Sequence, residues 1–432
     1  MRRAVGVVLT MVVVLWCTVA WGRVYIDITK PFSRQLPIAV GKFMPLPGAG
    51  EDPVGRLARA KLVDNLAFTG LFDFIPPESF ISQPDLTHPD CRKWTKIGAE
   101  LLITGGYQLK GGFLTIECRL FDVVEGKMLT GRRYEGTPKD VGAMMARFAD
   151  EVMLALTGER SVFSTMIAFV SARGGIKEIM LMRYDGSGVR KFTHREDICL
   201  YPAWSPKGKF LAYCSYVSRR PAVFIHALAG GSGRVVVNRP GVNITPVFTP
   251  TGDALAVSMS FTGRTNIYLV NLAGRILRKL TNGWGIDVAP SFSPDGKRMA
   301  FVSDRGGSPQ VYVLELATGR VYRLVYGFKY TAAPAWSPKG DRIAFQAQVD
   351  GVFQVATIRP DGTDLQVLTR GYGGGEDPSW SPDGRLIAYA SRRTGSYQIY
   401  VMTSAGQPIR RLTNLPGDQT DPAWSPRGLA VR

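Results

Sequence analysis

The chain has 432 residues, of which 53 are lysine or arginine and 35 aspartate or glutamate, so its formal net charge is +18. In a cytosolic protein such an excess would suggest nucleic acid as a partner. Outside the cytoplasm, anionic envelope polymers or acidic lipid headgroups are the counterparts to expect rather than nucleic acid. The basic residues are spread along the chain without a long run, so general solvation explains the charge, which identifies no specific partner.

The first 22 residues have the pattern of a secretory signal peptide. Two arginines are followed by an apolar core that ends at Val19, and then by a small-x-small cleavage site, Ala20-Trp21-Gly22. Lipid attachment at Cys17 is disfavoured because the bulky Trp16 precedes it. No later segment approaches the roughly 20 apolar residues that span a bilayer. We therefore expect an exported, soluble protein that is peripheral to the membrane.

Residues 23–158 predict a small α/β domain, large enough for its own core. Asp52-Pro53 indicates a helix start, an N-cap followed by proline at the first helical position. Gly70 ends this helix. Its apolar residues recur at helical spacing: Leu57, Leu62, Val63 and Leu66.

The second half of this domain begins with a short helix near Trp94. Three strand-like runs follow, at Leu101–Leu109, Phe113–Val124 and Met128–Tyr134. Thr137-Pro138 then opens a second long helix. The apolar face of that helix is marked by Val141, Met145, Phe148 and Val152.

The rest of the chain repeats one phrase at intervals of 44 residues. Each copy has a proline, a small or branched residue, an aromatic, Ser/Thr-Pro and a polar-Gly turn. The aromatic occupies six positions: Trp204, Phe248, Phe292, Trp336, Trp380 and Trp424. A fixed period of this length is typical of stacked or closed repeat architectures.

Each repeat accommodates four short strands. One ends at the aromatic, and the next three are represented by Met299–Ser303, Val311–Leu316 and Val321–Leu324. Turns such as Ser293-Pro-Asp-Gly296 suit type I geometry. Four strands in about 44 residues is the size of one propeller blade. We expect the aromatic rings to pack between neighbouring blades rather than to form a ligand site.

The number of blades follows from the two ends of the repeat region. The first copy lacks the aromatic strand and begins at Met166, whereas the last copy has that strand and little more. We expect a sixth blade that combines the C-terminal strand with strands from residues 166–196, which removes exposed sheet edges. The predicted fold class is α+β: an N-terminal α/β domain, then a six-bladed β-propeller over residues 159–432.

Four cysteines remain after the signal peptide. Cys199 and Cys214 are equidistant from the turn between their strands, so we expect them to be cross-strand neighbours. A disulfide is permitted in an exported protein, and two buried thiols are the equally open alternative because cross-strand geometry is often poor for bridging. Cys91 and Cys118 lie in the first domain, and their pairing is left open.

A search for catalytic or metal-binding motifs predicts no enzyme, no cofactor and no metal. The three histidines, His88, His194 and His226, lack metal-site spacing. There is no G-x-S-x-G elbow. The glycine-rich segment at 371–375 lacks the lysine of a phosphate loop, and the segment at 361–364 lacks the frame of a calcium loop. We interpret them as an inter-blade connection and a hairpin turn.

The repeat resembles the TolB propeller repeat. Its pattern Ser-Pro-Asp-Gly-x-x-Ile/Met-Ala-Phe/Tyr-x-Ser, with x-Ile/Val-Tyr-Val and Arg-x-Leu-Thr, is also found in propellers of peptidases and lyases. The leading segment is more specific: Arg23-Val-Tyr-Ile-Asp-Ile28, Pro37-Ile-Ala-Val40 and the α/β domain are similar to the N-terminal domain of TolB. The ending Pro422-Ala-Trp-Ser-Pro426 also matches, so the resemblance covers nearly the whole mature chain.

The resemblance implies a periplasmic, non-catalytic and monomeric adaptor of the Tol-Pal system, which supports outer-membrane integrity and cell division. It implies that the propeller binds the peptidoglycan-associated lipoprotein, with other outer-membrane lipoproteins as further partners. It also implies an N-terminal tail over residues 23–33 that docks or detaches and couples the propeller to TolA. The tail residues concerned are Arg23, Val24, Tyr25, Ile26, Asp27 and Ile28.

The position of the propeller mouth follows from strand direction. The connection that enters each aromatic strand shares a face with the loop between the second and third strands. We therefore expect the mouth to contain the residue that precedes the proline of each repeat: Tyr201, Thr245, Ala289, Ala333, Asp377 and Asp421. Val242 and Val288 match family positions associated with partner contact. The alternative interpretation is that these residues form ordinary connections between blades and bind no partner.

A second hypothesis from a different functional class is a propeller that binds or processes polysaccharide. It requires a polar channel lined by carboxylates or metal ligands, and the small number of histidines argues against it.

Overall fold

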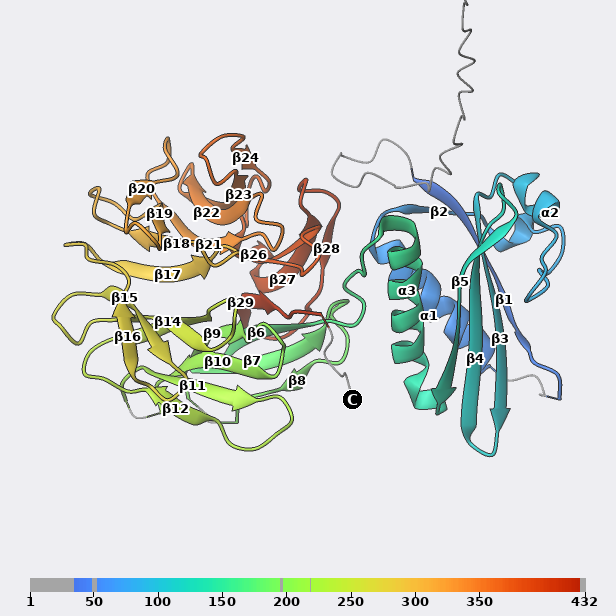
Figure 1. Cartoon of the computed structure of the whole chain (residues 1–432), viewed down its shortest axis with the longest axis horizontal. Coiled ribbons are helices and arrows are strands. Elements are labelled where there is room, and N and C mark those ends of the chain that lie inside the picture. The colour runs from blue at the N-terminus through green and yellow to red at the C-terminus, as the bar shows by residue number, and fades with distance from the viewer. Residues whose placement is uncertain (1–34, 49–52, 195–196, 218, 428–432) are drawn as a thin grey trace, which may run out of the picture.

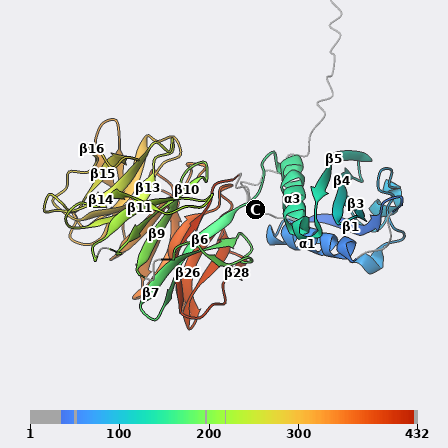
Figure 2. The same ribbon diagram turned by 90° about the horizontal axis from the view of Figure 1, so that it is seen from below.

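A computed structural model describes residues 35–48, 53–194, 197–217 and 219–427 (Figure 1). The expected signal peptide (1–22), the expected tail (23–33) and Asp52 of the expected helix cap lie outside the described residues. The described chain forms a helix-covered sheet beside a ring of smaller sheets (Figures 1 and 2). Within these described ranges, no helix combines the length and apolar character needed to cross a membrane.

The N-terminal part contains a five-stranded sheet in the order β2-β1-β3-β4-β5. β1 pairs in parallel with β2 and β3, and the other neighbours are antiparallel. The strands are β1 (Leu36–Pro45), β2 (Phe72–Phe74), β3 (Leu101–Lys110), β4 (Phe113–Asp122) and β5 (Lys127–Gly136). The three expected strands are confirmed as β3, β4 and β5. β1 and β2 were not among the strands expected from the sequence, because each joins the sheet by pairing with residues far away in the sequence.

Two long helices cover one face of this sheet (Figure 2). The helical segments are α1 (Val54–Phe68), η1 (Pro77–Ser79), α2 (Cys91–Thr95), η2 (Pro138–Asp140) and α3 (Val141–Thr157). Before α3, Thr137 and Asp140 form a capping box. The expected apolar face of α3 is buried. The buried residues of α1 include Val54, Ala58, Leu62 and Leu66, which are four residues apart and lie along one face of the helix. Leu57 was expected on this face, but it is 46% exposed and lies outside the core.

Six four-stranded sheets form the ring. Five are built from consecutive strands, which we name blade 1 (β9–β12), blade 2 (β13–β16), blade 3 (β17–β20), blade 4 (β21–β24) and blade 5 (β25–β28). Blades 1 and 2 contain β9 (Cys199–Trp204), β10 (Phe210–Ser215), β11 (Ala222–Ala227), β12 (Arg234–Val237), β13 (Asn243–Phe248), β14 (Ala254–Met259), β15 (Asn266–Asn271) and β16 (Ile276–Lys279). Blades 3 and 4 contain β17 (Asp287–Phe292), β18 (Arg298–Ser303), β19 (Gln310–Glu315), β20 (Val321–Arg323), β21 (Thr331–Trp336), β22 (Ile343–Val349), β23 (Val352–Ile358) and β24 (Gln366–Val367). Blade 5 contains β25 (Glu376–Trp380), β26 (Leu386–Thr394), β27 (Ser396–Thr403) and β28 (Ile409–Arg411).

The sixth sheet, the closing blade, joins the two ends of the propeller. Its order is β29-β6-β7-β8, with β29 (Asp418–Trp424), β6 (Met166–Arg173), β7 (Ile176–Arg183) and β8 (Arg190–Lys191). Trp424 lies opposite Ile167 in the antiparallel register. The side-chain oxygen of Ser425 accepts a 2.9 Å hydrogen bond from the backbone N–H of Met166. The predicted six-bladed ring and its closure are confirmed.

The aromatic residues pack between neighbouring blades, as expected. The indole N–H of Trp204 donates to the backbone oxygen of Ala423 at 2.9 Å, and that of Trp380 donates to Ala335 at 3.0 Å. Both bonds cross from one blade to the next. These two indole N–H groups find partners across a blade boundary, so these rings serve the stability of the ring of blades. The buried indole nitrogen of Trp336 has no hydrogen-bond partner among the described residues.

The cysteines of blade 1 are one residue out of the expected register. Cys199 pairs with Ser215, and Cys214 pairs with Leu200. Near the turn Trp204 pairs with Leu211, a register that would place Cys199 opposite Tyr216, and the bulge in β9 brings its partner back to Ser215. The four described cysteines, Cys91, Cys118, Cys199 and Cys214, are thiols rather than disulfides. The same bulge contains Tyr201, one of the expected site residues.

Candidate partner-binding site

Six residues at equivalent positions in the inner strands share a left-handed backbone. Each precedes the proline of its repeat, and their φ angles are Tyr201 56°, Thr245 48°, Ala289 52°, Ala333 47°, Asp377 51° and Asp421 50°. We name them the mouth ring. A positive φ is uncommon for residues other than glycine. The same conformation in all six blades shows that the repeat imposes it.

The left-handed residues lie in β-bulges of the inner strands. In β17, Val288 pairs with Val302 and Ser291 with Ala300, so two residues oppose one. The same register shift occurs in each of the other inner strands. Bulges of this kind redirect side chains and are enriched next to functional sites. Because each inner strand contacts the next around the ring, the six bulges surround the central channel.

Direct bonds connect parts of the mouth ring. The backbone N–H of Ala289 donates to the hydroxyl of Thr245 at 3.3 Å, and that hydroxyl lies 2.7 Å from the hydroxyl of Ser258. The backbone N–H of Asp377 donates to Oε1 of Gln346 at 3.0 Å. Asp421 donates a backbone hydrogen bond to the carboxylate of Asp377. The structure therefore links two neighbouring pairs of the expected site residues.

One side of the ring is acidic. Burial, followed by the charges of Asp421 and Glu376, raises the pKa of Asp377 well above its usual value. Burial also raises the pKa of Asp421 to about 6, against the opposing effect of Lys177. Burial and the two carboxylates raise the pKa of Tyr201. Both aspartates are half-buried, and no ion pair among the described side chains reaches either one.

Glu376 extends this acidic side toward the outer part of blade 5. The phenol of Tyr397 donates to its Oε1 at 2.6 Å. Burial and this carboxylate raise the pKa of Tyr397 to about 12. The phenol therefore stays protonated and holds Glu376 in place beside Asp377.

Val242 and Val288 lie at the entrance to two inner strands and are half-buried. The N–H of Val242 donates to the hydroxyl of Ser260 at 2.8 Å. Val288 directly precedes Ala289 and pairs with Val302. The structure thus places both valines next to the mouth ring.

The described residues contain no group of three or more His, Cys, Asp or Glu side chains placed to hold a metal ion. The segment at 371–375 connects β24 and β25, and a side chain at Gly374 would come within 2.1 Å of the backbone oxygen of Phe353. Asp361 accepts bonds from the backbone and hydroxyl of Thr363. These contacts account for both segments as structural connections.

The opposite face of the propeller adjoins the N-terminal part. Tyr184, at the end of β7, donates a 2.5 Å hydrogen bond to Oδ1 of Asn65 in α1. The guanidinium of Arg410 lies 5.1 Å from the centre of the Phe68 ring. Phe68 and Tyr184 meet edge to face at 4.9 Å. Sequence analysis missed this junction, because no local pattern signals a contact between residues so far apart.

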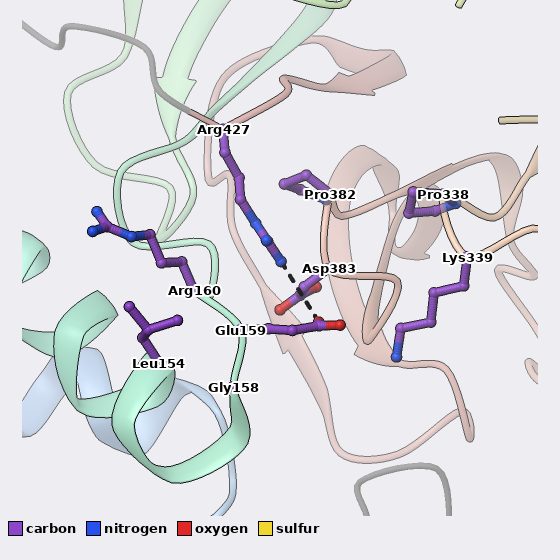
Figure 3. A pocket seen from close by; sticks show the side chains of 9 residues that line it. All are labelled: Leu154, Gly158, Glu159, Arg160, Pro338, Lys339, Pro382, Asp383 and Arg427. Atoms are coloured by element: carbon purple, nitrogen blue, oxygen red, sulfur yellow. Dashed lines mark ion pairs between the residues drawn. The ribbon is translucent and has the colours of Figure 1, made fainter. Parts of the chain in front are cut away.

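The connector between α3 and β6 borders a cavity of about 390 Å³ at this junction (Figure 3). Arg427 and Glu159 face each other across it, with 3.9 Å between the guanidinium and the carboxylate. Pro338, Lys339 and Pro382 reach it from turns of blades 4 and 5. The cavity therefore lies between the two parts of the chain and away from the mouth ring.

Comparisons with known proteins match both parts. Residues 153–428 match the family model described as the TolB beta propeller domain, and residues 24–129 match the TolB amino-terminal domain. The Tol-Pal system protein TolB of Desulfosudis oleivorans is 43% identical over 234 residues, which cover 53% of this chain and 53% of that protein. Its counterpart in Syntrophotalea carbinolica is 40% identical over 215 residues, or 48% of this chain and 49% of that protein. The chain spans about half the length of the curated relatives it matches.

A solved structure extends this similarity over the whole fold. TolB from Acinetobacter baumannii is similar with a TM-score of 0.81 and 26% sequence identity. The alignment covers 91% of this chain and 97% of that chain. The arrangement of an α/β part beside a six-bladed propeller is thus shared with a solved protein.

Proposed function

Because the chain belongs to the TolB family of Tol-Pal system proteins, we propose that it is a non-catalytic periplasmic adaptor. In this proposal the propeller mouth binds the peptidoglycan-associated lipoprotein, and the N-terminal region binds TolA. Other outer-membrane lipoproteins are further candidate partners, and no cofactor is required. The role served is outer-membrane integrity and cell division.

The mouth ring is the observation that carries the proposal. Six strained residues surround one end of the channel, and residues in such conformations concentrate at functional sites. The N-terminal part adjoins the other end of the strands, at Tyr184 and at the turn that contains Asp383. The described chain thus leaves the mouth face available to a partner.

The proposal also assigns a switching role to the tail at residues 23–33. We treat residues 23–158 and 159–432 as two domains, with the tail as the start of the first. Binding of the lipoprotein at the mouth and the docked state of the tail would bias each other, and thermodynamic linkage makes that bias reciprocal. The tail is followed closely by β1, so its movement would act first on the N-terminal sheet.

The test uses the mature protein and the soluble domain of the peptidoglycan-associated lipoprotein from the same organism. We expect calorimetry to show binding, and Asp377→Lys and Asp421→Lys to weaken it. The isosteric changes Asp377→Asn and Asp421→Asn separate loss of charge from loss of fold. Asp361→Lys, in a turn on the opposite face, is the matched control. Unchanged binding in all four mouth variants would remove the site assignment.

The switching role has its own test. Deleting residues 23–33 should abolish binding of soluble TolA. In the intact protein, the lipoprotein should change the affinity for TolA by some factor. The deletion should change the affinity for the lipoprotein by that same factor. Equal lipoprotein affinity with and without the tail would contradict the coupling.

A further inference from the structure

Three successive connections on the mouth face expose aromatic rings. Trp284 precedes β17, Tyr326 precedes β21, and Tyr372 precedes β25, with exposed fractions of 73%, 65% and 77%. We name these three residues the aromatic arc. They belong to adjacent blades, so they extend along one side of the mouth. Exposed aromatic residues grouped on one face are a mark of interaction surfaces.

Trp284 is held outward by a tightly packed loop. A side chain at Gly285 would come within 2.3 Å of Oδ1 of Asp304, and one at Gly283 within 2.7 Å of a guanidinium nitrogen of Arg305. The backbone N–H of Ile286 donates to Oδ1 of Asp304 at 2.6 Å. The two glycines therefore let the loop lie directly on residues 304 and 305.

Arg305 fixes the base of the same loop. Its guanidinium donates to both carboxylate oxygens of the buried Asp287, at 2.8 and 3.0 Å. It also lies 5.2 and 5.4 Å from the ring centres of Phe301 and Tyr312. One guanidinium nitrogen makes both contacts with the carboxylate, and Nε of Arg305 donates to the hydroxyl of Ser303 at 2.9 Å, so together with the aromatic contacts they leave the base of the loop little freedom. The backbone that carries Trp284 is thus held in place while its side chain is uncovered, which lowers the entropy cost of ordering this loop on binding.

A cavity of about 270 Å³ lies beside this indole. Arg264 and Thr265 of blade 2 form one wall, and Trp284, Ile286 and Asp304 form the other. The cavity is of a size that accepts a single side chain. An apolar side chain entering it would contact the indole and Ile286, which is 54% exposed.

Basic side chains accompany the aromatic arc. Arg264, Lys329, Arg370 and Arg392 are exposed in or beside the same set of loops. No ion pair between described residues involves any of the four. Arg392 lies next to Tyr372, because its backbone N–H donates to the backbone oxygen of Gly373 at 3.1 Å. The arc is therefore more basic than acidic, with Asp350 as an exposed acid among these loops and the half-buried Asp304 and Glu376 beside them.

We propose that the aromatic arc and its four basic residues bind an acidic face of the partner protein, which inserts one apolar side chain into the cavity beside Trp284. This inference rests on the proposed function, since its occupant is the soluble domain of the lipoprotein. Trp, Tyr and Arg are the residue types that dominate protein–protein binding energy. A fixed cavity next to four separated charges matches a folded protein better than a bilayer or a glycan chain. The partner is therefore seated over blades 2 to 5, off the centre of the mouth.

The test measures binding of the recombinant lipoprotein domain, without its lipid anchor, by calorimetry and stopped flow. Trp284→Ala should weaken affinity by about 10- to 100-fold, mainly through faster dissociation. The double variant Arg264→Glu and Arg370→Glu should slow association and reduce its dependence on salt. Phe113→Ala, a 76% exposed aromatic in the N-terminal part, and Arg359→Glu, in a far-face turn, are the matched controls.

The outcomes separate the two proposals. If Asp377→Lys and Asp421→Lys weaken binding while Trp284→Ala does not, the mouth binds the lipoprotein but the aromatic arc is overturned as its contact. If the wild-type protein does not bind the lipoprotein domain, both proposals fail. Vesicles with phosphatidylglycerol and soluble peptidoglycan fragments are tested in parallel. Binding to either that requires Trp284 would overturn a protein as the occupant of the arc.

Discussion

The phenol of Tyr184 and the amide of Asn65 form the shortest described polar link across the junction, with 2.5 Å between Oη and Oδ1. Tyr184 closes the end of β7, and Asn65 lies in the middle of α1. Both are buried, with 1% and 6% of their surfaces exposed. Around them, side chains of α1, α3, the connector and the closing blade form one continuous apolar cluster. The two parts of the chain therefore share a core, and their unfolding should be coupled.

Removing the hydroxyl in Tyr184→Phe tests this coupling. The change leaves Oδ1 of Asn65 without this donor in a buried setting, so we expect a loss of about 1–3 kcal/mol of stability. Differential scanning calorimetry should show a lower melting temperature for the whole chain rather than a separate early transition. Tyr372→Phe, in which the hydroxyl is at the exposed mouth face, should melt like the wild type. An unchanged melting temperature in Tyr184→Phe would contradict the assigned role.

Asp421→Asn should change how stability depends on pH. The pKa of about 6 in the folded protein exceeds the value of about 3.9 for an unfolded aspartate. The folded state binds this proton more tightly, so wild-type stability falls as pH rises from about 4 to about 6 and remains lower above that window. Asparagine cannot ionise. We therefore expect the variant to be more stable by about 1–3 kcal/mol at pH 7.5 and similar at pH 4.

Denaturant titrations at a series of pH values make this measurement. Because burial and the charge of Asp421 raise the pKa of Asp377 in the folded protein, Asp377→Asn should act in the same direction. Parallel stability profiles for wild type and both variants would rule out the raised pKa values as a source of instability.

Two tryptophans with opposite surroundings provide a matched pair. Trp424 is 7% exposed and its indole donates a 2.8 Å hydrogen bond to the hydroxyl of Thr165, whereas Trp284 is 73% exposed. Trp424→Ala should cost about 3–5 kcal/mol, because it leaves a cavity and removes the hydrogen bond to Thr165 where the ring closes. Trp284→Ala should leave stability within about 0.5 kcal/mol of the wild type. Similar losses in both variants would contradict the distinction between a packing residue and a binding residue.

The cysteines give a chemical prediction. Alkylation of the denatured protein without reductant, followed by mass spectrometry, should modify Cys91, Cys118, Cys199 and Cys214. In the native protein Cys91 should react first, because it is half-buried while the other three are buried. Burial also raises the pKa of the Cys214 thiol to about 12, which keeps it protonated and unreactive. Protection of Cys199 and Cys214 after denaturation would show that they form a disulfide.

The repeat made most of the propeller predictable. The series from Trp204 to Trp424 sets the length of each blade, and the incomplete copies at both ends predict the closing blade that pairs β29 with β6. Helix signals were equally local: Thr137-Pro138 marks the start of α3, and its apolar spacing marks the buried face. These features need only residues close in sequence, so pattern and propensity suffice.

The remaining features depend on contacts between distant residues. β1 becomes a strand through parallel pairing with β2 and β3. The pairing of Cys199 with Ser215 depends on where the hairpin is centred and on the bulge at Tyr201, whose left-handed φ recurs in all six inner strands. The proline after each mouth-ring residue was a visible signal that the strand is interrupted there. The exposure of Trp284 has no sequence signature beyond its two flanking glycines, because it depends on how the loop packs on Arg305.

The pairing of β29 with β6 also imposes an order on biosynthesis. A polypeptide is synthesised from its N-terminal end, so β6 is made about 250 residues before the strand that will cover it. Until then its edge offers unpaired backbone groups to any other extended segment. Long-range pairing of this kind slows folding and prolongs the exposure of aggregation-prone strand edges and apolar surface. A ring closed in this way should therefore depend on chaperones that shield the edge of β6 until its final strand has been made.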